Sequence, residues 1–405
     1  MTTLRTTISA VLCAGALAAS AQEAAPEKAM DIYGFAMMDM GYNAGAIDPN
    51  WFDVMRPTKL PAFKDQWGAE GNMYFSVRQT RLGFKGYTPT ALGELFTQFE
   101  FEMFGTGVDA GQTTIRLRHA YGQLGKWGAG QYWSPFMDID VFPNSVEYWG
   151  PSGMAFFRNI QLRYMPIQGD TKLTIALERP GASSDQGSYG QFIDDQNVRG
   201  RLALPDLSAE YRKATGFGYV EAAGILRSAQ WEDQNPDSIN LDGSALCYGI
   251  NLTSNIKYGP EKRNTVRVGL VYGAGIQNYM NDATTDIGVR ANPGNASKPI
   301  EGYALPLTAG SLFVDHFWNE KMSSTVGGSI TTITLDDSSD SSSFKTGTYA
   351  LANVMFYPAT NVMWGVEVQY GGRENFKDDW SYNAVKVQAS FKYNFGTALY
   401  RKKNG

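Results

Sequence analysis

The feature that most constrains this chain is a two-residue alternation of apolar and polar side chains, which recurs along most of its length. Over 384–395, apolar residues at 385, 387, 389, 391, 393 and 395 alternate with Lys386, Gln388, Ser390, Lys392 and Asn394. Such alternation predicts a strand with one apolar face and one polar face. No apolar run of 18 or more residues follows residue 21, so the sequence predicts no spanning helix.

The first 21 residues (1–21) predict a secretory signal peptide. Arg5 precedes an apolar stretch over 8–18, and the small residues at 19–21 suit a cleavage site. Without this segment Cys247 is the single cysteine, so the exported chain would have no internal disulfide. An exported chain of this kind would be soluble in the periplasm, secreted, or held in an outer membrane.

The alternation predicts sixteen strands, and their connections alternate between short and long. The strands are expected near 30–42, 72–88, 91–104, 112–125, 127–133, 157–166, 171–180, 206–214, 217–231, 244–258, 263–275, 307–319, 322–335, 345–358, 361–373 and 382–395. Short turns at one rim and long loops at the other are typical of outer-membrane barrels. The sequence therefore predicts an all-β fold, a sixteen-stranded antiparallel transmembrane β-barrel over 22–395, followed by a short C-terminal tail at 396–405.

The composition agrees with this expectation. The chain of 405 residues is 43% hydrophobic and 19% charged, because only one face of each strand has to be apolar. The formal net charge of −5 gives no sign of a nucleic-acid partner. A barrel of sixteen strands is too wide for its wall side chains to fill, so an aqueous channel is expected.

The long connection 134–156 is too apolar for a simple external loop. It contains seven large apolar or aromatic residues, namely Phe136, Ile139, Val141, Phe142, Tyr148, Trp149 and Phe156. We expect this third external loop to fold inward and to pack against the inner wall. Its acidic residues Asp138, Asp140 and Glu147 would then line one side of a pore constriction.

Positive charges on the polar faces of nearby strands are candidates for the opposite side. Arg81, Arg116, Arg118 and Arg163, with Lys85 nearby, should point inward, since an arginine facing lipid costs roughly 2–4 kcal/mol at mid-membrane. Rings of Arg and Lys select for anions. The alternative is that these arginines brace the wall by pairing with acids such as Glu100 and Glu102. Arg78 has the opposite parity and is expected at a rim, whereas Arg158 begins a strand and could face either way.

Several segments resemble one family of outer-membrane proteins, and they occur in the expected order over nearly the whole chain after residue 21. They are 31–35 (DIYGF), 78–84 (RQTRLGF), 117–121 (LRHAY), 130–136 (GQYWSPF), 204–206 (LPD), 316–318 (HFW) and 370–375 (YGGREN) with the preceding Glu367. The chain is similar to the DcaP-like family of trimeric porins, within the general bacterial porin superfamily. The resemblance implies a homotrimer in outer-membrane lipid and lipopolysaccharide, with an inward-folded third loop, that favours small anionic solutes such as dicarboxylates.

Two features differ from that family pattern. Only 22–30 lies between the expected cleavage site and the first strand, where the family carries a coiled-coil extension, and 396–405 follows Phe395, where such porins end on a phenylalanine. The family function would be passive diffusion of small hydrophilic solutes across the bacterial outer membrane.

Catalysis has little support in the sequence. The two histidines, His119 and His316, both fall on predicted strands, and no metal, cofactor or nucleophile motif accompanies them. We therefore predict a channel without a cofactor and not an enzyme. The alternatives are an outer-membrane β-barrel enzyme such as a lipid hydrolase, and a soluble exported β-rich carbohydrate-binding protein. Weak Ca²⁺ binding by the loop at 336–343 is a further alternative, although a solvated loop is favoured.

Overall fold

The computed structural model describes residues 28–235 and 237–400, so the predicted signal peptide at 1–21 lies outside the described residues. The strands of the main sheet are β1 (Lys28–Asn43), β2 (Asn72–Ser76), β3 (Arg81–Thr90), β4 (Gly93–Phe104), β5 (Thr113–Leu124), β6 (Trp127–Trp133), β7 (Arg158–Ile167), β8 (Lys172–Glu178), β10 (Val198–Arg201), β11 (Asp206–Thr215), β12 (Gly218–Asp233), β13 (Gly243–Tyr258), β14 (Asn264–Ala274), β17 (Pro306–Asn319), β18 (Met322–Ile333), β19 (Phe344–Ala359), β20 (Val362–Asn375) and β21 (Ser381–Tyr400). Each of the sixteen predicted strands has a counterpart among them.

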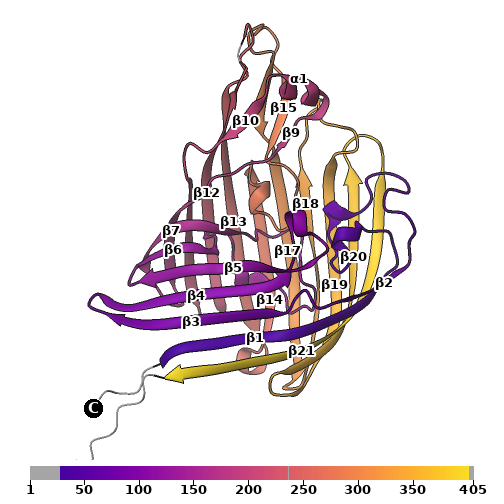
Figure 1. The fold of residues 1–405 in the computed structure, drawn as a ribbon. Helices are drawn as coiled ribbons and strands as arrows, with labels where there is room; N and C mark the ends of the chain where they lie inside the picture. The colour runs from indigo at the N-terminus through magenta and orange to yellow at the C-terminus, as the bar shows by residue number, and fades with distance from the viewer. Residues whose placement is uncertain (1–27, 236, 401–405) are drawn as a thin grey trace, which may run out of the picture.

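The main sheet closes on itself (Figure 1) because β1 pairs antiparallel with β21 from Lys28 to Asn43. Its eighteen strands form a barrel of sixteen, since β2 and β3 both pair with β1 and β10 continues the line of β11 along β12. Closure pairs the backbone amides that an open edge would leave exposed to hydrocarbon. The prediction of a sixteen-stranded antiparallel barrel is confirmed.

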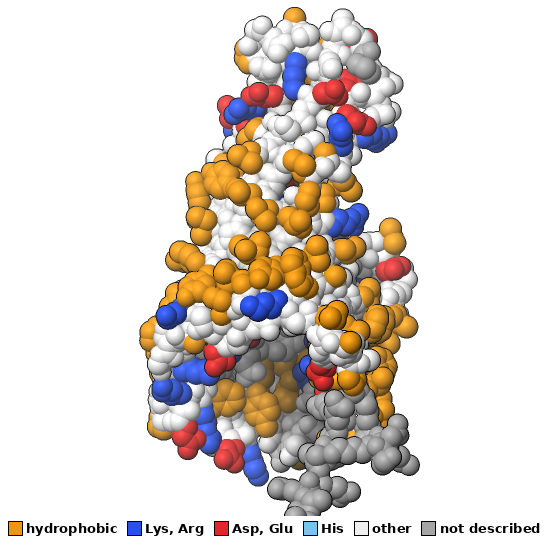
Figure 2. Space-filling view, turned by 90° about the vertical axis from the view of Figure 1, so that its left-hand side faces the viewer, with side chains coloured by type: hydrophobic (Ala, Val, Ile, Leu, Met, Phe, Trp, Pro, Cys, Tyr) orange, Lys and Arg blue, Asp and Glu red, His pale blue; other side chains and the backbone are white. Residues whose placement is uncertain are grey.

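The strands carry apolar side chains on the outside, as β13 illustrates. Leu246, Ile250 and Leu252 are exposed on the outer face, whereas Asn251 and Thr253 are buried toward the lumen. This is the reverse of a soluble protein and fits a wall bathed in lipid. Figure 2 shows the consequence on one face, where a band of apolar side chains crosses the middle of the molecule and most charged groups lie above and below it.

Two boundaries differ from the sequence-based expectation. The predicted strand over 72–88 is interrupted at 77–80, between β2 and β3, where Arg78 turns to the carboxylate of Asp53. At the other end, β21 runs to Tyr400, because Gly396–Tyr400 pair with the start of β1. The strand therefore ends five residues later than the alternation over 384–395 predicts, and the predicted tail at 396–405 begins inside it.

The long connections form the external end of the barrel. Two of them contribute β9 (Ser184–Asp185), β15 (Ile287–Ala291) and β16 (Ile300–Ala304), which form a separate three-stranded sheet. This sheet and the helix α1 (Gly190–Asp195) lie at the top of Figure 1, above the barrel rim. Short 3₁₀ helices also occur in the connections, at Pro49–Trp51, Pro57–Lys59, Gly107–Asp109, Ile139–Val141, Gly187–Tyr189, Pro260–Lys262 and Gln277–Tyr279. Among the described residues, none of the helices has the length and apolar character needed to span a membrane.

Candidate functional site

Residues 134–157, called the inner loop, fold into the barrel as the sequence predicts. Hydrogen bonds tie its backbone and side chains to well-separated strands, as three of them illustrate. Asn251 of β13 donates to the carbonyl of Phe136 (2.9 Å), and Gln388 of β21 donates to that of Val146 (3.1 Å). The Asn144 amide donates to Ser323 of β18 (3.0 Å). Because these strands come from different parts of the wall, the inner loop crosses the lumen and narrows it.

The acidic residues at the start of the inner loop serve as anchors. Asp138 is buried and accepts hydrogen bonds from Tyr219 (2.6 Å) and Thr253 (2.7 Å). The guanidinium of Arg212 on β11 bridges both acids, pairing with Asp138 at 2.6 Å and also with Asp140. These charges therefore fasten the loop to the wall, and the carboxylate of Asp138 is fully occupied by donors.

Glu147 forms a second anchor, deep inside the molecule. Its carboxylate lies 2.7 Å from the Nζ of Lys386, and both side chains are completely buried. The backbone N–H of Met55 also donates to this carboxylate, and Lys386 donates to the carbonyl of Asp53 (2.9 Å). Burial raises the pKa of Glu147, whereas the neighbouring ammonium of Lys386 lowers it. The pair joins the inner loop to β21 with no net charge.

A second loop, 44–71, also packs inside the barrel, which the sequence did not lead us to expect. Its Arg56 lies between the rings of Trp51 and Trp149, at 4.2 and 4.0 Å from their centroids. The same guanidinium pairs with Asp282 at 2.9 Å. Burial lowers the pKa of Arg56 and Asp282 opposes this, yet a guanidinium keeps its charge in a protein.

Four arginines on the wall beside the inner loop share two carboxylates, one of which, Glu102, also accepts a hydrogen bond from Tyr148 of the loop. Arg118 pairs with Glu100 at 2.6 Å and with Glu102 at 2.5 Å. The other three arginines lie farther from Glu102, at 3.5 Å for Arg81, 3.6 Å for Arg116 and 3.8 Å for Arg158. We call Arg81, Arg116, Arg118 and Arg158 the arginine wall. Four guanidiniums against two carboxylates leave an excess of two positive charges.

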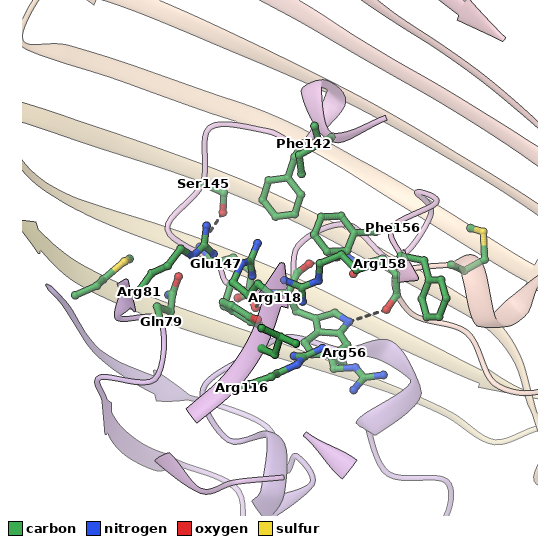
Figure 3. Close-up of a pocket in the computed structure, with 18 of the residues that line it drawn as sticks. Arg56, Gln79, Arg81, Arg116, Arg118, Phe142, Ser145, Glu147, Phe156 and Arg158 are labelled. Carbon is green, nitrogen blue, oxygen red and sulfur yellow. Dashed lines mark hydrogen bonds between the residues drawn. The ribbon is translucent and has the colours of Figure 1, made fainter. Parts of the chain in front are cut away.

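A cavity of about 760 Å³ lies between the arginine wall and the inner loop (Figure 3). Its lining contains six cationic side chains, which are those of Arg56, Arg81, Arg116, Arg118, Arg158 and Lys392. Its one lining carboxylate is Glu147, which Lys386 already neutralises. Apolar and aromatic side chains such as Phe142, Tyr148 and Phe156 complete the lining. The narrow part of the lumen is therefore positively charged.

The structure places the predicted cationic residues in three different settings. Arg81, Arg116 and Arg118 line the cavity. Arg163 does not, because it is buried in the wall, donates to Gln161 (3.0 Å) and lies 5.0 Å from the centre of the Tyr132 ring. Lys85 also lies outside the cavity lining, with its Nζ 5.1 Å from the centre of the Tyr33 ring.

The predicted acidic residues are placed differently from what we expected of a constriction. Asp138 and Asp140 lie outside the cavity lining, at the Arg212 anchor. Glu147 lines the cavity but is paired with Lys386. The acids that do pair with the arginine wall are Glu100 and Glu102, which lie on β4 of the barrel and not on the inner loop.

Three cavity cations are not singled out by the sequence. Lys392 alternates with Phe391 and Tyr393 on β21, so the pattern does indicate its inward direction. For Arg158 the sequence leaves the direction open, because this arginine is the first residue of β7. Arg56 comes from the loop 44–71, where no periodic pattern indicates direction.

Both histidines occupy aromatic surroundings. The Nε2 of His119 lies 3.9 Å from Glu100, and its ring contacts Tyr132 and Trp133. His316 contacts Tyr258, with 3.3 Å between the Nδ1 and the hydroxyl. Within residues 28–235 and 237–400, no group of three or more His, Cys, Asp or Glu side chains is arranged to hold a metal ion.

A closed barrel of sixteen strands with an apolar exterior, a charged lumen and an inward-folded loop is the architecture of a porin of the outer membrane. The model of the family described as DcaP outer membrane protein matches residues 61–395. The chain belongs to this family. The predicted family and the outer-membrane location are thus confirmed.

Solved structures agree on the fold. The outer membrane channel DcaP of Acinetobacter baumannii superimposes with a TM-score of 0.74 at 21% identity, covering 90% of this chain and 97% of that one. An anion-selective porin from Comamonas acidovorans gives 0.56 at 9% identity, covering 91% and 100%. The trimer form of OmpT, an outer membrane protein of Vibrio cholerae, gives 0.52 at 12% identity, covering 91% and 100%. No curated protein sequence matched the chain.

Proposed function

We propose that the protein is a passive diffusion channel whose constriction favours small hydrophilic anions, including dicarboxylates. The family and the porin fold support a channel in the outer membrane. The observation that carries the preference for anions is the cavity lining, in which six cations outnumber Glu100, Glu102 and Asp282, the three carboxylates that pair with five of them. Cationic rings in pores attract anions and repel cations.

The arginine wall suits carboxylate solutes for two reasons. Its guanidiniums are permanently charged and present planar forks that match a carboxylate in two hydrogen bonds. Arg81 and Arg116 keep 24% and 30% of their side chains exposed, and they lie 3.5 and 3.6 Å from Glu102. These two arginines therefore retain donors that an incoming carboxylate can use. Arg118 is engaged at close range by both glutamates, so its role is to hold the wall together.

The passive mechanism follows from the same geometry. A solute carboxylate would exchange water for arginine donors while it passes the inner loop, and the pairing of these arginines with Glu100 and Glu102 keeps its binding weak enough for release. No chemical step is required. The surroundings of His119 support this proposal over a barrel hydrolase, since two aromatic rings and Glu100 surround its imidazole.

Planar-bilayer recording tests the proposal directly. The purified protein should conduct, and its reversal potential in a KCl gradient should have the sign of chloride preference. Arg81→Gln and Arg116→Gln should each reduce the ratio of chloride to potassium permeability, whereas Arg199→Gln, an exposed residue of β10, should leave it unchanged. The absence of channels would refute the channel, and potassium preference would refute the anion claim.

We further propose a homotrimer embedded in outer-membrane lipid and lipopolysaccharide. Large apolar side chains, including Met73, Phe75, Phe99 and Ile115, are exposed on the outer face of β2, β4 and β5. The trimer form of the Vibrio cholerae protein, which shares the fold, supports the same assembly. Light scattering of the detergent-solubilised protein should give three chains per particle, and a single chain per particle would refute it.

We also propose that 1–21 is removed on export and that the barrel domain begins after it. N-terminal sequencing of the membrane-inserted protein should then begin at Gln22. An intact Met1 on the inserted protein would overturn this assignment.

A further inference from the structure

The lumen contains a second cavity, of about 730 Å³, next to the first. It is lined by the short turns between β17 and β18 and between β19 and β20, which places it at the periplasmic end. Three residues line both cavities, namely Ser145, Met363 and Lys392. Lys392 therefore lies at the boundary between the two cavities, beside the path of a solute that moves from the constriction toward the periplasm.

Lys392 differs from the other cations of the lumen. The four arginines of the wall pair with Glu100 or Glu102, and Arg56 pairs with Asp282. Within the described ranges 28–235 and 237–400, Lys392 forms no ion pair with a carboxylate. The acid that lines the second cavity, Glu320, lies 3.6 Å from Arg263 instead. Thus no carboxylate in the described part of the chain compensates the positive charge of Lys392.

The immediate neighbours of Lys392 are apolar. The strand register sets it directly opposite Met37 on β1 and Met363 on β20. Its Nζ lies 4.0 Å from the centre of the Phe35 ring. A half-buried ammonium among methionines and a ring has lost part of its water shell, so an anion that approaches it is attracted more strongly than in bulk water.

The Phe35 ring also connects Lys392 with the arginine wall. The guanidinium carbon of Arg81 lies 5.2 Å from the same ring centre, because Phe35 and Arg81 are register partners on β1 and β3. Since both distances end at one point, the two cationic groups are separated by no more than the sum of 5.2 and 4.0 Å. An anion as long as a dicarboxylate can therefore contact Lys392 before it has left Arg81.

We propose that Lys392, together with Phe35 and Arg81, forms a second anion subsite on the periplasmic side of the constriction. It receives an anion from the arginine wall and passes it to the periplasmic cavity. This assignment rests on the proposed anion channel and adds a specificity residue to it. The unpaired charge of Lys392 attracts an anion to the periplasmic side of the constriction. The channel then has a second anion-binding position besides the paired arginines.

The test compares three single variants with the native protein in planar bilayers. Lys392→Gln removes the charge and Lys392→Arg retains it. Lys85→Gln is the control, because Lys85 carries a positive charge on the polar face of the wall but lines neither cavity. One unit charge at about 4 Å in water-like surroundings changes anion occupancy about five-fold at low salt. We expect Lys392→Gln to lower the chloride-to-potassium permeability ratio by this factor, and Lys392→Arg to retain it.

A second measurement follows block by an added dianion, succinate, while chloride carries the current. Lys392→Gln should weaken block most strongly when succinate is added on the periplasmic side. Heat-modified migration on gels confirms that each variant is folded.

The outcomes separate this inference from the proposed function. Suppose that the native protein prefers chloride, but that Lys392→Gln lowers the chloride-to-potassium permeability ratio no more than Lys85→Gln does. The subsite is then refuted and the anion channel stands. If the native protein shows no anion preference, the proposed function itself fails. A greater loss in Lys392→Gln than in Lys85→Gln, with retention in Lys392→Arg, supports the subsite.

Discussion

The buried pair of Glu147 and Lys386 offers a sharp test of how the inner loop is held. Both side chains are completely buried, and their charged atoms lie 2.7 Å apart. Lys386→Met keeps the length of the side chain but leaves the carboxylate without its cation. Removing one partner of a buried pair typically costs about 3–5 kcal/mol. At about 1.4 kcal/mol per factor of ten, docking of this part of the loop should weaken roughly 10²- to 4 × 10³-fold.

The carboxylate of the variant can escape its uncompensated charge by binding a proton. Without the ammonium, the folded-state pKa of Glu147 rises further above its unfolded value, so the native state is relatively favoured at low pH and loses stability as pH rises through that pKa. The destabilisation caused by Lys386→Met should therefore be larger at about pH 9 than at about pH 5. Replacing both residues, as in Glu147→Met with Lys386→Met, removes the unpaired charge and should restore most of the loss.

Thermal unfolding in detergent and single-channel recording provide the assays. Release of the inner loop should lower the melting temperature and increase both conductance and current noise. Lys345→Met, which removes an exposed lysine of β19, is the matched control. The reasoning is refuted if Lys386→Met behaves like Lys345→Met, or if the double variant is as unstable as the single one.

Three further predictions concern the wall and the field in the lumen. Arg163→Gln should lower the melting temperature but leave ion selectivity unchanged, because this arginine is buried outside the cavity; selectivity and melting are measured on the same preparation. The preference for chloride over potassium should decline between about 0.1 and 1 M salt, because the screening length falls from about 10 to about 3 Å. Reversal potentials at several salt concentrations measure it, and a preference that stays constant would contradict the prediction. Ile250→Arg, near the middle of β13, should cost about 2–4 kcal/mol in a folding titration in lipid vesicles, whereas Phe217→Arg beside a turn should cost about 0–1 kcal/mol, and equal costs would contradict the assigned lipid face.

The wall of the barrel is readable from the sequence because its determinants are local. Each strand needs apolar residues at every second position, and its neighbours must repeat that pattern in register. Whether a side chain faces the lipid or the lumen therefore follows from its odd or even position along the strand. This is why the alternation by itself identifies Arg81, Arg116 and Arg118 as lumen residues. Arg163 has the same parity but meets Gln161 and Tyr132 in the wall, so parity does not distinguish a pore residue from a bracing residue.

The loops are less predictable because their contacts are between residues far apart in the chain. The inward fold of 134–157 can be inferred from its apolar content, whereas the loop 44–71 gives no such indication. Its Arg56 reaches the cavity only because Trp51, Trp149 and Asp282 surround it. The external sheet of β9, β15 and β16 likewise depends on the meeting of two distant loops.

The sequence by itself determined the barrel, its strands and which side chains turn toward water, since the alternation of period two and the lengths of the connections are written into each segment. Only the tertiary structure decided which charges remain available in the lumen. Asp138 and Asp140 are occupied by Arg212, and Glu147 is neutralised by Lys386, so the acids predicted to line the constriction became anchors. The physical reason is that an ion pair depends on distances across the barrel, which no single segment specifies.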